Sequence, residues 1–180
     1  MKKLLILLLA LCLLLCCGCA GETPKVDRPD SAEVETTTEA QVELAPQITV
    51  YDRAGTPVQL SDMIGKPVII NFWATWCGPC KSELPAFQQA YEAYGEDICF
   101  MMVDMVSGRT ETKKGAIEYV DGQGYTFPLY FDEDETAVVA YGITAVPATF
   151  VLDAKGALVE SHVGAMSFNE LEELLQTVLS

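Results

Sequence analysis

The sequence has few basic residues. Lys and Arg together number 11 against 26 Asp and Glu, and the formal net charge is -15. A chain with this balance has no basic surface on which to hold the phosphates of a nucleic acid, so we expect it not to bind one. Half of its 180 residues (50%) are hydrophobic, which is enough to bury the core of one domain and excludes disorder throughout.

Cysteines are also scarce beyond the first twenty residues. Four of the seven lie near the N-terminus: Cys12, Cys16, Cys17 and Cys19. The remaining three are Cys77, Cys80 and Cys99. Three cysteines are a poor framework for a disulfide scaffold, and their spacing indicates a redox pair with one spare cysteine.

A zinc site is the alternative interpretation of two cysteines three residues apart. Zinc needs about four ligands, and beyond Cys77 and Cys80 the folded part offers only Cys99 and the single histidine, His162. We interpret Cys99 as a small residue inside a buried strand and His162 as an ordinary residue at the end of a strand. We therefore expect no metal and no cofactor.

The first nineteen residues have the layout of a bacterial export signal. Two lysines precede an apolar run from Leu4 to Leu15, and small and sulfur-bearing residues follow. The pattern resembles lipoprotein signals, in which Gly18 before Cys19 would make Cys19 the lipid-modified residue, although position 16 holds Cys in place of the usual Leu. The uncharged stretch to Gly21 also reaches the lower limit for a membrane span, so an uncleaved anchor stays open, as does plain secretion. Either tether would place the domain outside the cytoplasmic membrane.

Residues 20–46 differ in composition from the rest of the chain. They contain seven acids, two bases and three prolines, without apolar periodicity. Such a segment cannot bury enough apolar surface to fold, so we interpret it as an acidic, disordered tether. The predicted organisation is an export signal at 1–19, this tether at 20–46, and a folded domain at 47–180.

The folded domain alternates strand and helix signals, which predicts an α/β fold. The continuous apolar run at 68–73 predicts a buried central strand. A helix over 77–94 follows it, with apolar residues at helical spacing and Gly95 at its end. The other predicted elements are strands at 48–51 and 57–60, which form a hairpin, strands at 98–105, 129–131, 148–152 and 158–163, and helices at 112–121, at 135–141 and from Ser167 to about Leu179.

The chemistry is concentrated where the buried strand turns into the helix, at Trp76-Cys77-Gly78-Pro79-Cys80. Two cysteines three apart in the first turn of a helix lie on one face, so their sulfurs can form and reopen a disulfide. The free N–H groups and the positive dipole of the helix start favour a thiolate on the leading sulfur. We predict Cys77 as the nucleophile and Cys80 as the resolving thiol that attacks the mixed disulfide.

The segment from Asn71 to Pro85, NFWATWCGPCKSELP, resembles the active-site segment of the TlpA-like (ResA-type) thiol-disulfide oxidoreductases, the extracytoplasmic branch of the thioredoxin superfamily. The resemblance covers most of residues 45–180. It implies a thioredoxin fold with an N-terminal β-hairpin, a central mixed sheet flanked by helices, and a helix-strand unit inserted at roughly 106–131.

The same resemblance implies a substrate groove beside the disulfide. The Val146-Pro147 bond is implied to be cis and to face the two cysteines, and its neighbouring backbone would pair with a bound substrate strand. The predicted groove residues are Trp76, Gly78, Pro79, Val146 and Pro147.

Glu83 is the third predicted catalytic residue. Thioredoxin keeps a buried Asp where this chain has Asn71, so the usual proton acceptor beneath Cys80 is missing, and members of the resembling family carry a Glu at the position of Glu83. On a helical wheel Glu83 falls on the apolar side, near Cys80. The alternative is that Glu83 turns to the rim of the groove as an ordinary acid of the first helical turns.

The resemblance implies a membrane-tethered extracytoplasmic oxidoreductase that reduces disulfides in exported proteins. It implies a CcdA-type or DsbD-type membrane electron donor, and acceptors such as apocytochrome c or a methionine sulfoxide reductase. Gly-Pro between the cysteines is the dipeptide of thioredoxin, whose potential of about -270 mV favours the reducing direction. We expect a monomer.

Other functions remain open at this point. A disulfide-forming oxidase or an isomerase would use the same fold and the same cysteines, and a non-catalytic binding lipoprotein would use the same groove. A peroxiredoxin shares part of this fold, but it would need a lone peroxidatic cysteine in a Thr-rich loop with a nearby Arg. The sequence contains neither.

Overall fold

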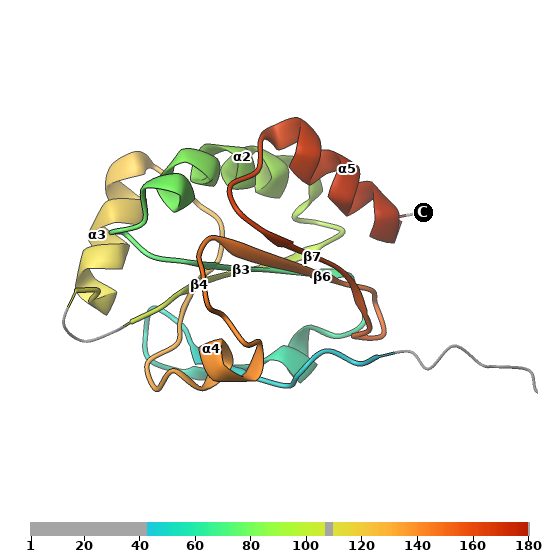
Figure 1. The fold of residues 1–180 in the computed structure, drawn as a ribbon, viewed down its shortest axis with the longest axis horizontal. Helices are drawn as coiled ribbons and strands as arrows, with labels where there is room; N and C mark the ends of the chain where they lie inside the picture. The colour runs from blue at the N-terminus through green and yellow to red at the C-terminus, as the bar shows by residue number, and fades with distance from the viewer. Residues whose placement is uncertain (1–42, 107–109, 180) are drawn as a thin grey trace, which may run out of the picture. The chain divides into compact units, whose positions relative to one another are not determined.

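The computed structural model describes residues 43–106 and 110–179, so the predicted export signal and most of the predicted tether lie outside it. Within these residues the strands are β1 (Thr49–Tyr51), β2 (Pro57–Gln59), β3 (Val68–Trp73), β4 (Cys99–Asp104), β5 (Leu129–Phe131), β6 (Ala148–Leu152) and β7 (Leu158–Val163). They form one mixed sheet in the order β2-β1-β5-β4-β3-β6-β7 (Figure 1). This sheet confirms the predicted fold class.

The helices lie on both faces of the sheet. They are α2 (Gly78–Tyr94), α3 (Lys113–Gln123), α4 (Thr136–Ala140), α5 (Phe168–Leu179) and a short 3-10 helix, η1 (Leu60–Met63), which was not predicted. One face of the sheet carries α2, α3 and α5, and the opposite face carries α4 and η1 (Figure 1). None of the helices in the described ranges has the length and apolar character to cross a bilayer.

β3 lies near the middle of the sheet and is buried on both faces. It runs parallel to β4 and antiparallel to β6, and all six of its residues are buried. Since neighbouring side chains of a strand point to opposite faces, Ile69 and Trp73 pack beneath α2 while Phe72 packs on the α4 side. Asn71 shares the parity of Ile69 and Trp73, so its amide points toward α2.

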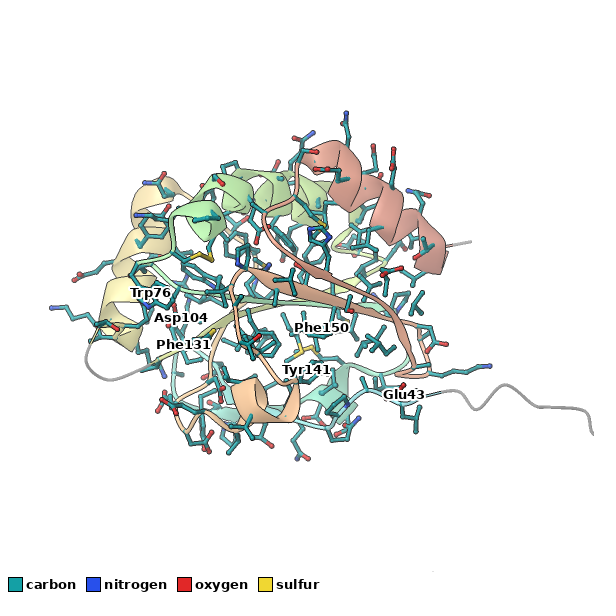
Figure 2. All side chains as sticks on the ribbon, in the orientation of Figure 1. Glu43, Trp76, Asp104, Phe131, Tyr141 and Phe150 are labelled. Carbon is teal, nitrogen blue, oxygen red and sulfur yellow. A yellow bond between two sulfur atoms is a disulfide. The ribbon has the colours of Figure 1, made fainter. Side chains whose placement is uncertain are left out.

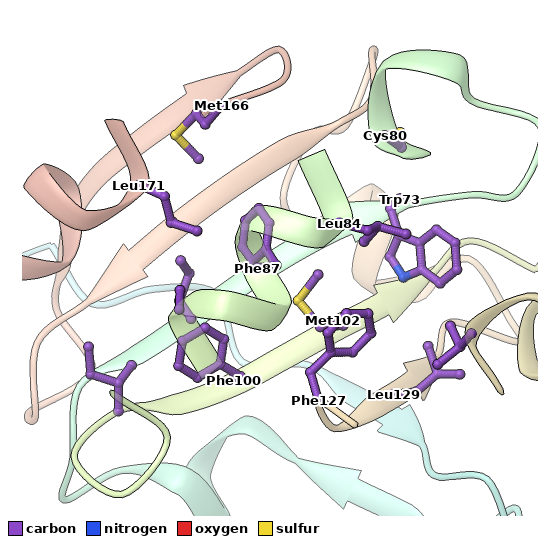
Figure 3. Close-up of a cluster of buried hydrophobic side chains, with 14 of the residues drawn as sticks. Trp73, Cys80, Leu84, Phe87, Phe100, Met102, Phe127, Leu129, Met166 and Leu171 are labelled. Atoms are coloured by element: carbon purple, nitrogen blue, oxygen red, sulfur yellow. The ribbon is translucent and has the colours of Figure 1, made fainter. Parts of the chain in front are cut away.

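α2 packs on β3 and β4 through one apolar face. Its buried residues include Cys80, Leu84 and Phe87, and Figure 3 shows Leu84 and Phe87 projecting into the cluster that also holds Trp73 and Phe100. The helix ends at Tyr94, as predicted. This fixes the first turn of α2, which carries both cysteines, against the end of the central strand.

Gly95, which follows α2, is required because the site has no room for a side chain. Its backbone has an ordinary right-handed conformation, but a Cβ atom there would lie 2.6 Å from the carbonyl oxygen of Tyr91. A side chain at this position would therefore force the end of the helix to shift.

The inserted helix-strand unit is confirmed as α3 and β5. β5 pairs in parallel with β4, and it pairs antiparallel with β1 at Tyr51 and Phe131. The insertion therefore lies between the central strands and the N-terminal hairpin, and it joins that hairpin to the rest of the sheet.

Residues 43–46, which we assigned to the tether, instead pair with the folded domain. Leu44 forms an antiparallel bridge with Ala157, and the N–H of Ala45 donates to the carbonyl oxygen of Gly156 at 2.9 Å. Ala45 is buried. Backbone pairing to a distant turn orders this short segment, and composition carries no signal of such pairing.

The prediction that Cys99 is buried inside a strand is wrong. β4 begins at Cys99, and its side chain is a partly exposed free thiol whose Sγ lies 3.8 Å from the carbonyl oxygen of Met63. Cys99 packs against the margin of the core on the α4 side and also lines a surface pocket, which leaves its thiol partly exposed.

Candidate active site

The strand-to-helix junction places the two cysteines at the start of α2. Cys77 is the N-cap residue of the helix, and Cys77 and Cys80 are joined by a disulfide with Cα atoms 5.2 Å apart. Pro79 lies in the first turn, where the N–H group that proline lacks would have no partner within the helix. The Cys-Gly-Pro-Cys segment can therefore begin a helix and hold both sulfurs together.

The two sulfurs differ in exposure and in electrostatic environment. Cys77 is 5% exposed while Cys80 is completely buried. The backbone N–H of Cys80 donates to Cys77 Sγ at 3.1 Å, and an N–H at a helix start stabilises negative charge on the atom it contacts. Both differences favour Cys77 as the sulfur that meets a substrate.

The cis peptide bond expected between Val146 and Pro147 is confirmed. It precedes β6, which lies next to β3, and it brings the carbonyl oxygen of Val146 to 3.6 Å from Cys77 Sγ. The backbone at Val146 therefore lies directly beside the more accessible sulfur.

A groove with a volume of about 340 Å³ lies next to this sulfur. Its lining residues are Trp76, Met105, Ile143, Thr144, Ala145 and Val146. Trp76 is 54% exposed, so one of the side chains that line the groove is large, apolar and open to solvent. Such a concave apolar surface next to a reactive sulfur suits the side chains of an extended peptide.

The groove partly matches the one expected from the sequence. Trp76 and Val146 line it, whereas Gly78, Pro79 and Pro147 do not. Gly78 and Pro79 are exposed at the start of α2, and Pro147 is buried.

Four residues that line the groove were missed. Ile143, Thr144 and Ala145 directly precede Val146, so their position in the chain could have indicated them. Met105 follows β4 and reaches the groove because its N–H donates to the carbonyl oxygen of Trp73 at 3.0 Å. That pairing of distant segments leaves no local pattern in the sequence.

Glu83 lies on the buried side of α2, and its side chain is only 1% exposed. Its Oε1 accepts a hydrogen bond from Asn71 Nδ2 at 2.8 Å, and its Oε2 accepts one from the backbone N–H of Met166 at 3.0 Å. Asn71 Nδ2 also donates to Thr149 Oγ1 at 3.0 Å. The alternative that Glu83 turns to the rim of the groove is therefore wrong.

The environment of Glu83 changes its proton affinity. Burial raises the pKa of this carboxyl to about 7, although the hydrogen bonds from Asn71 and Met166 act in the opposite direction. Glu83 and Cys80 are both fully inside the protein, one helical turn apart on α2. A carboxyl with this pKa can accept and return a proton near neutral pH.

Two partners of Glu83 could not be found from the sequence. Thr149 comes from β6, and Met166 comes from the segment between β7 and α5, on parts of the chain far from α2. Neither has a spacing relation to Glu83. The pairing of β3 with β6, at Asn71 and Thr149, is what brings the polar groups together.

Comparisons with known proteins identify the family of this chain. Residues 42–161 match the model of the AhpC/TSA family. A thiol-disulfide oxidoreductase ResA from Bacillus thuringiensis subsp. konkukian is 30% identical over 184 residues, which cover 99% of each chain.

Solved structures share the fold. A thiol:disulfide interchange protein of the thioredoxin family from Chlorobium tepidum superposes with a TM-score of 0.69 and 27% identity, covering 79% of this chain and 99% of its own. The pneumococcal exposed lipoprotein thioredoxin Etrx1 from Streptococcus pneumoniae superposes with a TM-score of 0.64 and 26% identity, covering 73% of this chain and 98% of its own.

The family model spans well over half of the sequence, and the ResA similarity runs through the segment that carries the Cys77–Cys80 disulfide. The sequence expectation of a TlpA-like relative is thereby confirmed. The chain belongs to the AhpC/TSA family and is a thiol-disulfide oxidoreductase with the thioredoxin fold.

Proposed function

We propose that this chain reduces disulfides in exported proteins while it is tethered on the outer side of the cytoplasmic membrane. The observation that carries the proposal is the position of Cys77 Sγ, which lies beside an apolar groove and 3.6 Å from the carbonyl oxygen of Val146. An extended substrate strand could pair with the backbone at Val146 and present its own disulfide to Cys77.

The exchange proceeds in two steps once the pair has been reduced. The Cys77 thiolate attacks one sulfur of the substrate disulfide, which forms a mixed disulfide and releases the other substrate sulfur as a thiolate. Cys80 then loses its proton to Glu83 and attacks Cys77 Sγ, which releases the second substrate thiolate and closes the Cys77–Cys80 disulfide. The substrate gains two electrons, and Glu83 later returns its proton to solvent or to a thiolate.

Continued turnover requires a donor that opens the Cys77–Cys80 disulfide again. A membrane protein of the CcdA or DsbD type fits this requirement, because it would deliver two electrons at the face where the tethered domain resides. Apocytochrome c and methionine sulfoxide reductases are suitable acceptors, since each presents a cysteine disulfide after export. The donor and the substrate would use the same groove in turn.

The tether is supported by the N-terminal sequence and by one relative. The apolar run and Gly18-Cys19 have the form of a lipoprotein signal, and Etrx1 is described as an exposed lipoprotein. A lipid on Cys19 would hold the domain at the membrane through the acidic segment that follows, and an uncleaved signal anchor would give the same location.

The reduction potential of the Cys77/Cys80 couple tests the direction of the reaction. A reductant should equilibrate with glutathione or dithiothreitol buffers near the value of thioredoxin, about -270 mV, because the two share the Gly-Pro dipeptide. A value near -120 mV, which is typical of the oxidase DsbA, would contradict the proposal. A value near -180 mV would favour an isomerase. Replacing Pro79 by His provides the matched control, because it changes only the dipeptide between the cysteines.

A further inference from the structure

Two acids outside the redox pair are buried at the end of the sheet that carries the disulfide. Asp104 is the last residue of β4, and Glu111 lies in the segment just before α3. Both side chains are buried, and Figure 2 labels Asp104 at the same end of the sheet as Trp76. Neither acid has a role in the exchange described above.

Strand register directs Asp104 toward the helices. Asp104 pairs with Trp73 across β3 and β4, and it has the same parity as Phe100 and Met102, which pack against α2. Among the described residues no hydrogen-bond donor reaches either of its carboxyl oxygens. Burial is the main cause that raises the pKa of Asp104 to about 9, and the charge of Glu111 adds to it. Asp104 therefore keeps its proton at neutral pH.

Glu111 also holds the loop that leads into the disulfide. Its Oε2 accepts hydrogen bonds from the backbone N–H of Thr75 at 3.1 Å and from Thr75 Oγ1 at 2.7 Å. Thr75 lies two residues before Cys77, and the N–H of Cys77 donates to the carbonyl oxygen of Ala74 at 3.1 Å. A carboxylate that accepts two hydrogen bonds from one residue restrains both its backbone and its side chain.

We propose that Glu111, backed by Asp104, is a positioning residue that holds Thr75 and thereby fixes the orientation of Cys77 for attack on a disulfide. The proposal rests on thiol-disulfide exchange alone. It stands whether the chain works as a reductant or an oxidant, and wherever it is located.

The pair predicts a response to pH. At neutral pH Asp104 is protonated and neutral, and Glu111 accepts the two hydrogen bonds from Thr75. When Asp104 ionises, a negative charge appears in this buried site, and its repulsion of the carboxyl oxygens of Glu111 weakens the contact of Glu111 with Thr75.

The charged groups on the neighbouring elements have other partners. Lys113 of α3 pairs with Glu133 at 3.0 Å, and Asp132 after β5 accepts the N–H groups of Ala137 and Val138. Tyr119 of α3 packs against the ring of Trp73. Within the described part of the chain, Glu111 is thus the charge that acts on Asp104.

The first test measures the reaction of the reduced full-length chain with a small aromatic disulfide in single turnover. Thr75→Val removes the hydroxyl donor but keeps the branched shape, and we expect attack by Cys77 to slow about tenfold at pH 7. Thr126→Val is the matched control, since it removes a hydroxyl that is hydrogen-bonded to Gln88, away from the disulfide. Equal rates for the two variants, at similar thermal midpoints, would overturn the proposal.

The second test follows Thr75 itself in the oxidised chain, where neither cysteine titrates. The carbon chemical shifts of Thr75 should change with a midpoint near pH 9 in the wild type, as Asp104 ionises. Asp104→Asn should abolish this step and keep the rate at pH 7 within about twofold, because a neutral amide replaces a neutral carboxyl. A Thr75 titration that persists unchanged in Asp104→Asn would refute the pairing.

Glu111→Gln keeps the second test decisive if Asp104→Asn fails to fold. The amide oxygen still accepts from Thr75, but the negative charge facing Asp104 is gone. The Thr75 titration should therefore move to lower pH. A midpoint that stays near pH 9 in this variant would show that Asp104 and Glu111 are not coupled.

Discussion

Asn71 donates a hydrogen bond from Nδ2 to Glu83 Oε1 at 2.8 Å, across the interface between the central strand and α2. The amide of Asn71 cannot accept and return a proton in the way a carboxyl can. Glu83, one turn from Cys80 on α2, is therefore the group suited to accept the proton that Cys80 must lose. Asn71 then serves to hold the carboxyl in place. Thioredoxin fills this buried polar site with a single Asp. In this chain two residues, Asn71 and Glu83, occupy it together.

Replacing Glu83 by Gln tests its role in proton transfer. The shape is kept and the titration is lost, so resolution by Cys80 should slow about 10- to 100-fold at pH 7 while the first attack by Cys77 is unchanged. The deficit should shrink as pH rises, because Cys80 then ionises without help. Stopped-flow reduction of a model disulfide between pH 5 and 9 measures both steps. Glu92→Gln, on an exposed position of the same helix, is the control, and a wild-type profile for Glu83→Gln would remove Glu83 from the mechanism.

The unequal exposure of the two sulfurs predicts which variant traps a substrate. In Cys80→Ser the mixed disulfide with Cys77 cannot be resolved, so covalent complexes with a disulfide-bearing protein such as insulin should accumulate on non-reducing gels. Cys77→Ser should form few, since Cys80 is completely buried. Both variants belong in a Cys99→Ser background, because Cys99 is a partly exposed free thiol. Equal amounts of covalent complex from the two variants would contradict the assignment of Cys77 as nucleophile and Cys80 as resolving thiol.

A lipid on Cys19 predicts a specific loss of membrane attachment. In a bacterial host, Cys19→Ala should abolish metabolic labelling with a fatty acid and either release the protein or leave an unprocessed precursor. Cys17→Ala is the matched control and should keep the label. If the wild-type chain stays in membranes at full length without label, it is held by an uncleaved anchor instead.

The raised pKa values of Glu83 and Asp104 predict that stability falls as pH rises. In the folded protein Glu83 keeps its proton up to about pH 7 and Asp104 keeps its proton up to about pH 9. In the unfolded chain both groups lose their protons near pH 4. Within each window the unfolded state binds fewer protons, so each group lowers the free energy of unfolding by up to about 1.4 kcal/mol per pH unit. The loss due to Glu83 levels off above pH 7, and the loss due to Asp104 continues to pH 9.

Urea unfolding of the oxidised chain at pH 5, 6, 7, 8 and 9 measures this slope. Asp104→Asn should flatten the profile between pH 7 and 9, and Glu83→Gln should flatten it only below pH 7. Parallel profiles for the wild type and Asp104→Asn above pH 7 would show that Asp104 is already ionised in the folded protein.

Much of the fold could be predicted because its signals are local. The apolar run at β3 is continuous because the strand is buried on both faces, and α2 shows helical spacing because one side of it packs on the sheet. The short η1 helix was missed, since four residues carry too little periodicity to be recognised. The start of β4 was placed one residue early, and Cys99, expected inside the strand, is its first and partly exposed residue.

The sequence alone determined the redox pair, because Cys77 and Cys80 are neighbours in one helical turn and their spacing is visible in the chain itself. It also indicated that Glu83 faces inward. Only the tertiary structure decided what surrounds these groups. Strand register brings Thr149 to Asn71 and places Asp104 beside Trp73, and the insertion carries Glu111 back to Thr75. Such contacts join segments far apart in the chain, and hydrophobic periodicity, which reports only on the nearest turns of a helix or strand, contains no record of them.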